Sequence, residues 1–258
     1  MKCPRCGSTL LDNAGNCGFC GQNLSVIHYV RRISGTYYNL GLEKATVRDL
    51  TGAIGMLKKS LSYDKENVNA RNLLGLIYYE MGEIVAALSE WVLSKYLSPD
   101  DNMADYFIET IQANQGLLDT MDQTIKKYNA ALDSAKAGNE DLAIIQLKKV
   151  VSLNPRFIKA AQLLAMLYMK TEEYGKAYKC LIRIKKIDAT NTTTLRYLNA
   201  LSEVMNIDQS ADFVVKRSEN RRDPLKNVTP VGAYREERRS LMPFIYVVIG
   251  LAVGIAVC

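Results

Sequence analysis

Four cysteines near the start of the 258-residue chain form two pairs, Cys3-Pro4-Arg5-Cys6 and Cys17-Gly18-Phe19-Cys20. Each pair has the Cys-x-x-Cys spacing that places two thiolates on one metal ion, and ten residues separate the pairs. A redox dithiol usually appears as one such motif beside a βαβ pattern, whereas two motifs at this separation close a tetrahedral site. The spacing therefore predicts one zinc ion per chain, bound by Cys3, Cys6, Cys17 and Cys20.

We expect this zinc to be structural, because four thiolates leave no open coordination position for water. A segment of about 24 residues cannot bury enough apolar surface to fold alone, so the metal must provide most of its stability. Gly7, Gly18 and Gly21 are expected to supply positive-φ positions in the two turns. The single histidine, His28, lies outside both pairs and is expected to be a partly exposed linker residue and not a ligand.

Residues 1–24 resemble the short zinc ribbon that opens many bacterial membrane and regulatory proteins. In that family a proline usually follows the first cysteine of the second pair, and Gly18 stands there in this chain. All four ligand positions are intact. The resemblance implies a zinc ribbon over residues 1–26.

Small residues recur in the middle of the chain at a fixed interval. Ala53, Ala87, Ala143 and Ala177 follow one another at intervals of 34, 56 and 34 residues. A period of 34 is that of the tetratricopeptide repeat (TPR), in which small residues let paired helices approach closely. The chain resembles that family most clearly over Leu74-Gly75-x-x-Tyr78, Ala87, Trp91 and Pro99, over Gly138, Ala143, Leu147 and Pro155, and over Leu164-Ala165-x-x-Tyr168, Tyr174, Ala177 and Leu181.

The expected fold is therefore all-α: a TPR-type α-solenoid over residues 34–206, with the zinc ribbon before it. We assign repeats to 34–67, 68–101, 124–157 and 158–191, followed by a capping helix near 192–206. Residues 102–123 are extra to the period and are expected to form helix, with a turn at Asn114-Gln115-Gly116. A basic flexible linker is expected over 207–240.

In such arrays the first helix of each repeat lines a concave face that usually holds a peptide or a partner helix. The residues expected there combine amides, which can bond an extended backbone, with tyrosine and methionine, which adapt to side chains. Helical tyrosine and methionine are also ordinary packing residues. The expected partner-binding positions are Asn69, Asn72, Leu76, Tyr79, Tyr128, Leu132, Gln162, Met166 and Met169.

The last 18 residues, Leu241–Cys258, carry no charge. As a helix they would span about 27 Å, close to the hydrocarbon thickness of a bilayer, which predicts a transmembrane helix. Arg235, Arg238 and Arg239 precede it, and the positive-inside rule places them in the cytoplasm. We therefore expect a single-pass protein of the cell membrane with a cytoplasmic ribbon and array. Gly250 and Gly254 form a Gly-x-x-x-Gly match, a weak indication of homodimers.

The sequence offers no catalytic constellation: it has no Gly-rich phosphate loop, no nucleophile elbow and one isolated histidine. It indicates a non-enzymatic, membrane-tethered scaffold or adaptor with a protein partner. The alternative is a nucleic-acid-associated regulator that uses the ribbon and the basic linker. Only Lys2 and Arg5 are basic near the cysteines, too few for useful phosphate affinity. The excess of eight basic over four acidic residues in 216–240 is explained equally well by anionic lipid.

Overall fold

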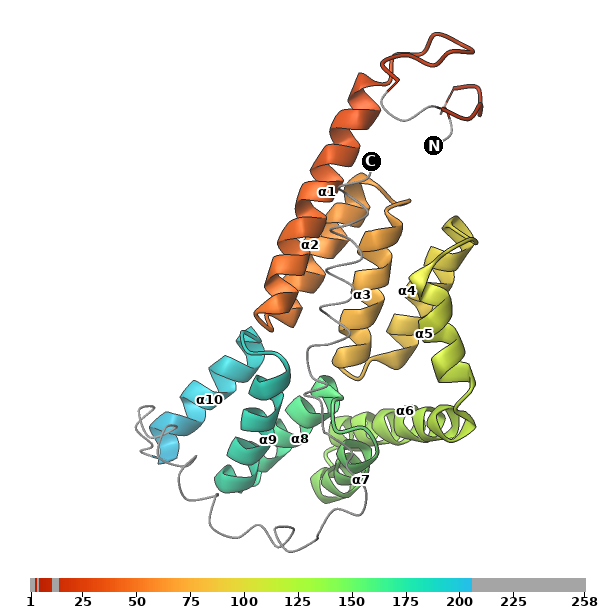
Figure 1. Cartoon of the computed structure of the whole chain (residues 1–258). Helices are drawn as coiled ribbons and strands as arrows, with labels where there is room; N and C mark the ends of the chain where they lie inside the picture. The colour runs from red at the N-terminus through yellow and green to blue at the C-terminus, as the bar shows by residue number, and fades with distance from the viewer. Residues whose placement is uncertain (1–2, 4, 11–13, 206–258) are drawn as a thin grey trace, which may run out of the picture. The chain divides into compact units, whose positions relative to one another are not determined.

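The computed structural model describes residues 3, 5–10 and 14–205, and in that part of the chain it contains ten α-helices and no strand (Figure 1). This confirms the all-α helical-repeat architecture for the described residues. The predicted linker, 207–240, and the predicted membrane helix, 241–258, lie outside them. The helices are α1 (Ser25–Thr46), α2 (Leu50–Tyr63), α3 (Val68–Glu80), α4 (Ile84–Leu97), α5 (Met103–Gln112), α6 (Gln115–Lys136), α7 (Glu140–Leu153), α8 (Ile158–Lys170), α9 (Tyr174–Ile187) and α10 (Thr192–Met205).

Four helix pairs, α1/α2, α3/α4, α6/α7 and α8/α9, make up the array, and α10 packs against the last of them. The four recurring alanines, Ala53, Ala87, Ala143 and Ala177, are all fully buried. Close approach is tightest in the second pair, where a Cβ added at Gly75 would lie 2.5 Å from Nε1 of Trp91. The small residues therefore sit where helices touch, as the 34-residue period predicts.

Two helices occupy the stretch that is extra to the repeat period. The Asn102 side chain accepts a hydrogen bond from the backbone N–H of Ala104 and so begins α5. The Asn114 side chain accepts one from Leu117 and begins α6. Because α6 has 22 residues, it runs on past residue 124 and also serves as the first helix of the third pair.

Loops of the first two helix pairs contact loops of the last two pairs, although they are far apart in the sequence. The backbone N–H of Ala189 donates to the carbonyl of Arg48 at 2.9 Å, in the turn after α1. In the turn after α3, Nδ2 of Asn154 donates to the carbonyl of Gly82, also at 2.9 Å. In both contacts a turn of the first two helix pairs is hydrogen-bonded to a loop of the last two pairs. The array therefore doubles back on itself.

Candidate functional site

The two cysteine pairs have the same backbone structure, displaced by 14 residues. The N–H of Cys3 donates to the carbonyl of Ser8, and the N–H of Cys17 donates to that of Gln22, both at 2.8 Å. Gly7 and Gly21 occupy equivalent places, with φ of +72° and +69°. The expectation for Gly18 was wrong, because Gly18 is not among the residues with positive φ. Glycine is therefore required after the second cysteine of each pair and not between the cysteines.

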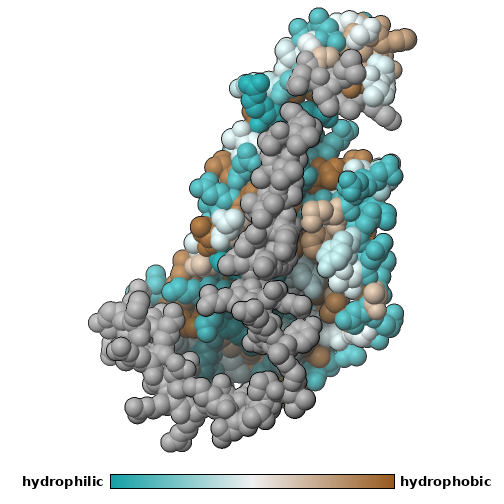
Figure 2. All heavy atoms as spheres, in the orientation of Figure 1, coloured by the Kyte–Doolittle hydropathy of each residue, from teal (hydrophilic) through white to brown (hydrophobic). Residues whose placement is uncertain are grey.

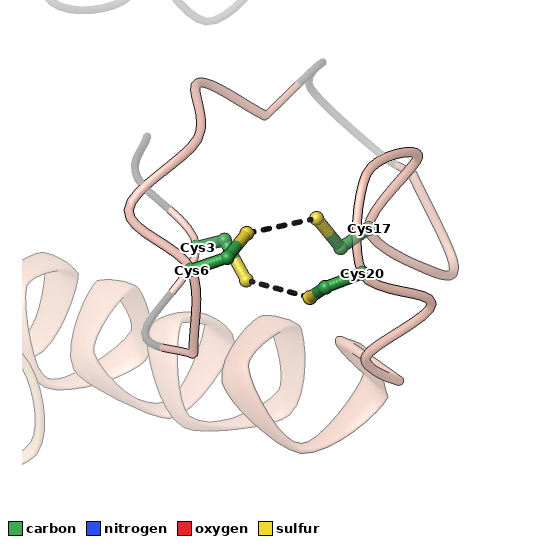
Figure 3. A group of neighbouring side chains, drawn as sticks. All are labelled: Cys3, Cys6, Cys17 and Cys20. Carbon is green, nitrogen blue, oxygen red and sulfur yellow. Dashed lines mark hydrogen bonds between the residues drawn. The ribbon is translucent and has the colours of Figure 1, made fainter.

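The four sulfur atoms converge on one point (Figure 3). The Sγ atoms of Cys3 and Cys20 are 3.6 Å apart, those of Cys6 and Cys17 are 3.7 Å apart, and all four lie within 4.8 Å of one another. A tetrahedral zinc with Zn–S bonds of about 2.3 Å requires S···S separations of about 3.8 Å. The sulfur positions therefore fit a tetrahedral metal ion, and the four predicted ligands are brought together.

Polar groups around the sulfurs favour thiolates at part of the cluster. The hydroxyl of Ser8 lies 3.0 Å from Sγ of Cys6 and 3.3 Å from Sγ of Cys17. Together with the backbone N–H groups of Cys20 and Phe19, it lowers the pKa of Cys17 to about 6. The Gln22 backbone favours the Cys20 thiolate, but burial and the neighbouring thiols raise the pKa of Cys20 to about 12. Four thiolates at these distances need a cation to balance their charge.

The segment that carries the four cysteines is joined to α1 by a small apolar core. Leu10 and Leu24 are buried with Cys3 and Cys17, and Ile27 in the first turn of α1 packs against them. Nε2 of His28 lies 2.9 Å from the carbonyl oxygen of Ala14 and donates to it. The expectation of a linker residue was wrong, because His28 belongs to α1 and its ring ties that helix to the segment. It lies outside the sulfur cluster.

The predicted partner-binding residues differ in what they contact. Nδ2 of Asn72 donates to Asn102 at 2.9 Å, and Nε2 of Gln162 donates to Asn191 at 2.8 Å, so both amide groups bond within the array. Leu76 is 5% exposed. Of the rest, Asn69 and Met166 are exposed, whereas Tyr79, Tyr128, Leu132 and Met169 are partly buried. The structure therefore leaves only part of this set available to a ligand.

Tyr128 lines an open pocket of about 480 Å³, which we call the junction pocket. The pocket lies where the start of α4, the middle of α6 and the loop before α8 meet. Its apolar lining includes Val85, Met121, Ile125, Tyr128 and Phe157, and Tyr128 packs on Phe157 with ring centroids 4.9 Å apart. Nζ of Lys159 and a carboxylate oxygen of Glu83, also lining residues, form an ion pair of 2.7 Å.

Most lining residues of this pocket were missed by the sequence analysis. Val85 and Ile125 are 57% and 38% exposed. The pocket depends on contact between α4 and the loop before α8, about 70 residues later, which the repeat period does not predict. The available signal was the composition of α4, IVAALSEWVLSKYL, in which apolar residues are spread around the whole helix. A helix of that kind is normally buried on every side.

The solvent-facing side of α4 is in fact exposed and apolar. Val85, Val92, Leu93 and Tyr96 are between 46% and 81% exposed. Single exposed hydrophobic residues are common, and Figure 2 shows them scattered among hydrophilic residues on the face that it draws. In α4, by contrast, they follow one another on one helix face, and Val85 belongs to the junction pocket. Val85 therefore joins the pocket to the exposed apolar residues of α4, and the exposed Ser89 lies between Val85 and Val92.

Comparison with known families gives one match, which covers residues 158–191 and is to the tetratricopeptide repeat. The match falls on helices α8 and α9. The matched range is the same as the fourth repeat assigned from the sequence. A comparison with curated proteins found no match.

Several solved structures resemble the chain. A crystal structure of MamA is 18% identical, covers 78% of this chain and 98% of its own, and has a TM-score of 0.32. YrrB, described as a TPR protein with an unusual peptide-binding site, is 17% identical, with 67% and 95% coverage and a TM-score of 0.32. The type IV pilus biogenesis factor PilW is 18% identical, with 71% and 98% coverage and a TM-score of 0.30. These likenesses are too distant to carry a function to this chain.

Proposed function

We propose that this protein is a non-enzymatic scaffold, tethered to the cell membrane by residues 241–258, whose cytoplasmic repeat array binds a protein partner. The observation that carries the proposal is the junction pocket with the adjoining apolar face of α4. Contiguous exposed apolar surface on a helical-repeat array is typical of a protein-binding site. The tetratricopeptide match at 158–191 supports the same class of function.

The partner is best described as an amphipathic helix with apolar anchors. Val85, Val92 and Tyr96 lie seven and four residues apart, so they form a stripe along α4. This stripe is about 16 Å long, the length over which a partner helix of three turns could contact it. One large apolar side chain of the partner would enter the pocket beside Tyr128 and Ile125, as in other helix-in-groove complexes.

The four cysteines would hold one structural zinc ion. Bound zinc would link the two cysteine pairs and balance the charge of their thiolates. The chain's own residues would then complete the ribbon: Leu10 and Leu24 bury its small core, and His28 fastens it to α1. The ribbon would thus hold the N-terminal end of α1 in place.

The membrane tether is supported by the uncharged sequence 241–258 and the arginines before it. No helix among the described residues is long and apolar enough to cross a membrane. Alkaline carbonate washing of membranes from the native host tests the tether. The full chain should stay with the membranes, and recovery in the wash would contradict it.

The partner site is tested by co-purification of the full chain from detergent-solubilised membranes. A Val85→Asp/Ile125→Asp variant places two carboxylates at exposed pocket positions and should lose the main partner seen with wild type. The matched control is Ile145→Asp on α7, which is 64% exposed and lies outside the pocket. Retention of the partner by the pocket variant, with its release by a four-cysteine variant, would assign binding to the ribbon.

A further inference from the structure

The solvent-facing side of α9 is basic, and the helix itself contains no acidic residue. The helix contains five basic residues, Lys176, Lys179, Arg183, Lys185 and Lys186, and no aspartate or glutamate. Lys179, Arg183 and Lys186 lie four and three residues apart, which places them on one face. All three are exposed, whereas Ala177, Leu181 and Ile184 form the buried side of the helix. We call Lys179, Arg183 and Lys186 the α9 basic face.

The basic face differs from the lysines of α2 and α4. Lys58 and Lys59 of α2 lie over the rings of Tyr78 and Tyr37. Lys95 of α4 pairs with Asp105. By contrast, none of the ion pairs between described residues includes Lys179, Arg183 or Lys186. Their charge is therefore available to an anionic partner.

The sequence that follows the array points to the same kind of partner. Residues 216–240 contain eight basic and four acidic residues and lead directly into the uncharged run 241–258. A helix bearing basic residues near a membrane tether is attracted to anionic headgroups, with each lysine or arginine contributing about 1 kcal/mol. Three charges on one helix face also match a flat layer of phosphates, which a groove-reading contact to nucleic acid would not require.

We infer that the α9 basic face binds the anionic lipid headgroups of the membrane that carries the tether. This inference rests on the proposed membrane attachment, and it adds a second contact that fixes how the array faces the bilayer. Lys176 contributes less than the other three, because Glu173 already pairs with it. The ligand is the phosphate-bearing surface of the bilayer, and attraction to it weakens as salt screens the charges.

The test uses the chain that ends at residue 205, because all ten described helices and the cysteine cluster belong to one compact unit, Met1–Met205. Co-sedimentation is measured with vesicles of pure phosphatidylcholine and with vesicles that also contain phosphatidylglycerol. Wild type should bind only the anionic vesicles, and added salt should release it. A Lys179→Glu/Arg183→Glu/Lys186→Glu variant should bind them on the order of 100-fold more weakly, from a factor of about five for each charge.

The matched control is Lys65→Glu/Lys127→Glu/Lys148→Glu, which changes the net charge equally at three exposed lysines outside α9. It should keep most of the wild-type affinity. Circular dichroism checks that both variants fold, and the neutral Lys179→Gln/Arg183→Gln/Lys186→Gln variant replaces the first one if charge reversal unfolds it. Equal losses in the two triple variants, or no preference of wild type for anionic vesicles, would overturn the inference.

Nucleic acid is the competing ligand, so the same variants are titrated with duplex DNA and with RNA at the same salt concentration. Tighter binding of wild type to either polymer, lost in the α9 variant alone, would also overturn the inference. The carbonate wash of the full chain separates the two proposals. A chain that stays in washed membranes while the 1–205 fragment ignores lipid charge would leave the tether standing and remove only the α9 contact.

Discussion

Helices α4 and α9 are the second helices of two different repeats. Equivalent positions are buried in both, but the residues that face solvent differ. Both have 14 residues, and α9 follows α4 at a distance of 90 residues. The buried residues Ala87, Trp91 and Ser94 of α4 correspond to Ala177, Leu181 and Ile184 of α9. On the solvent side, Ser89, Leu93 and Tyr96 correspond to Lys179, Arg183 and Lys186.

This difference shows which positions of a repeat are free to change. Packing between helices fixes size and position on the buried side, since interiors are as dense as organic crystals. The solvent side has no such constraint, and repeat arrays use it and the concave face for binding. In this chain one solvent side is apolar and continues into a pocket, and the other is basic. We therefore assign them different partners, a protein for α4 and lipid headgroups for α9.

The largest expected effect comes from removing metal, and it should leave both helices unchanged. Chelation should unfold residues 3–24, because structural zinc contributes on the order of 10 kcal/mol to a segment that has almost no other core. Limited proteolysis should then cut before α1, while circular dichroism retains its helical signal. Elemental analysis should find one zinc per chain beforehand. A zinc content near zero after metal-replete expression would contradict the metal site.

Substitution at equivalent buried positions of α4 and α9 should destabilise both repeats. Trp91→Ala should cost about 3–5 kcal/mol and Leu181→Ala about 2–5 kcal/mol, because both side chains are completely buried. Trp91 loses in addition its stacking on Phe107, with ring centroids 4.7 Å apart. Urea unfolding of the 1–205 fragment measures both. One buried methylene is worth about 0.8 kcal/mol. A cost under about 1 kcal/mol at either position would show that the two side chains do not occupy equivalent buried positions.

A smaller effect is expected at the residues that follow the two helices, Ser98 and Asp188. Asp188 is fully buried and accepts hydrogen bonds from the backbone N–H of Leu50 at 3.0 Å and from Nδ2 of Asn191 at 3.1 Å. Asp188→Ala leaves the buried N–H of Leu50 without a partner and leaves Nδ2 of Asn191 only its bond to the Thr51 hydroxyl, so it should cost about 1–3 kcal/mol.

The matched control is Ser98→Ala, since the Ser98 hydroxyl bonds only locally, to the carbonyl of Asp100. It should change the free energy of unfolding by less than about 0.5 kcal/mol. Equal effects of the two substitutions in urea unfolding would mean that the contact between the first and last helix pairs adds no stability.

The smallest effect on stability is expected when α4 receives the solvent-side residues of α9. A Leu93→Arg/Tyr96→Lys variant changes two exposed positions and should shift the free energy of unfolding by no more than about 0.5 kcal/mol at each. It should nevertheless weaken co-purification of the partner, since it interrupts the apolar stripe. Thermal unfolding and the co-purification assay are read together. Strong destabilisation would show that this face belongs to the core of the array.

Local patterns predicted the helical-repeat fold and the clustering of the four cysteines. Ala53, Ala87, Ala143 and Ala177 recur with the period of one helix pair, and all four are fully buried. The cysteines lie within 18 residues of sequence, so their spacing alone brings the sulfurs together. Gly18 was misjudged because the positive φ follows the second cysteine of each pair, at Gly7 and Gly21.

Contacts between distant segments could not be predicted in the same way. The period indicates which side of a helix Asn72 and Gln162 occupy, but it does not show that Asn102 and Asn191 accept from their amides. Nor does it show that Asn154 donates to Gly82, 72 residues earlier, beside the junction pocket. The proposed partner-binding surface depends on that reversal of the array, and of the predicted set only Tyr128 lines the pocket. The other predicted positions remain predictions.

The most direct test of the two assignments is photo-crosslinking of the full chain in native membranes, with a diazirine amino acid in place of Val85 or of Lys179. Both side chains are exposed, so the label fits either position without disturbing the core. Mass spectrometry of the adducts should find a protein attached at position 85 and phospholipid attached at position 179. The same protein at both positions, or lipid at position 85 and none at 179, would contradict the account.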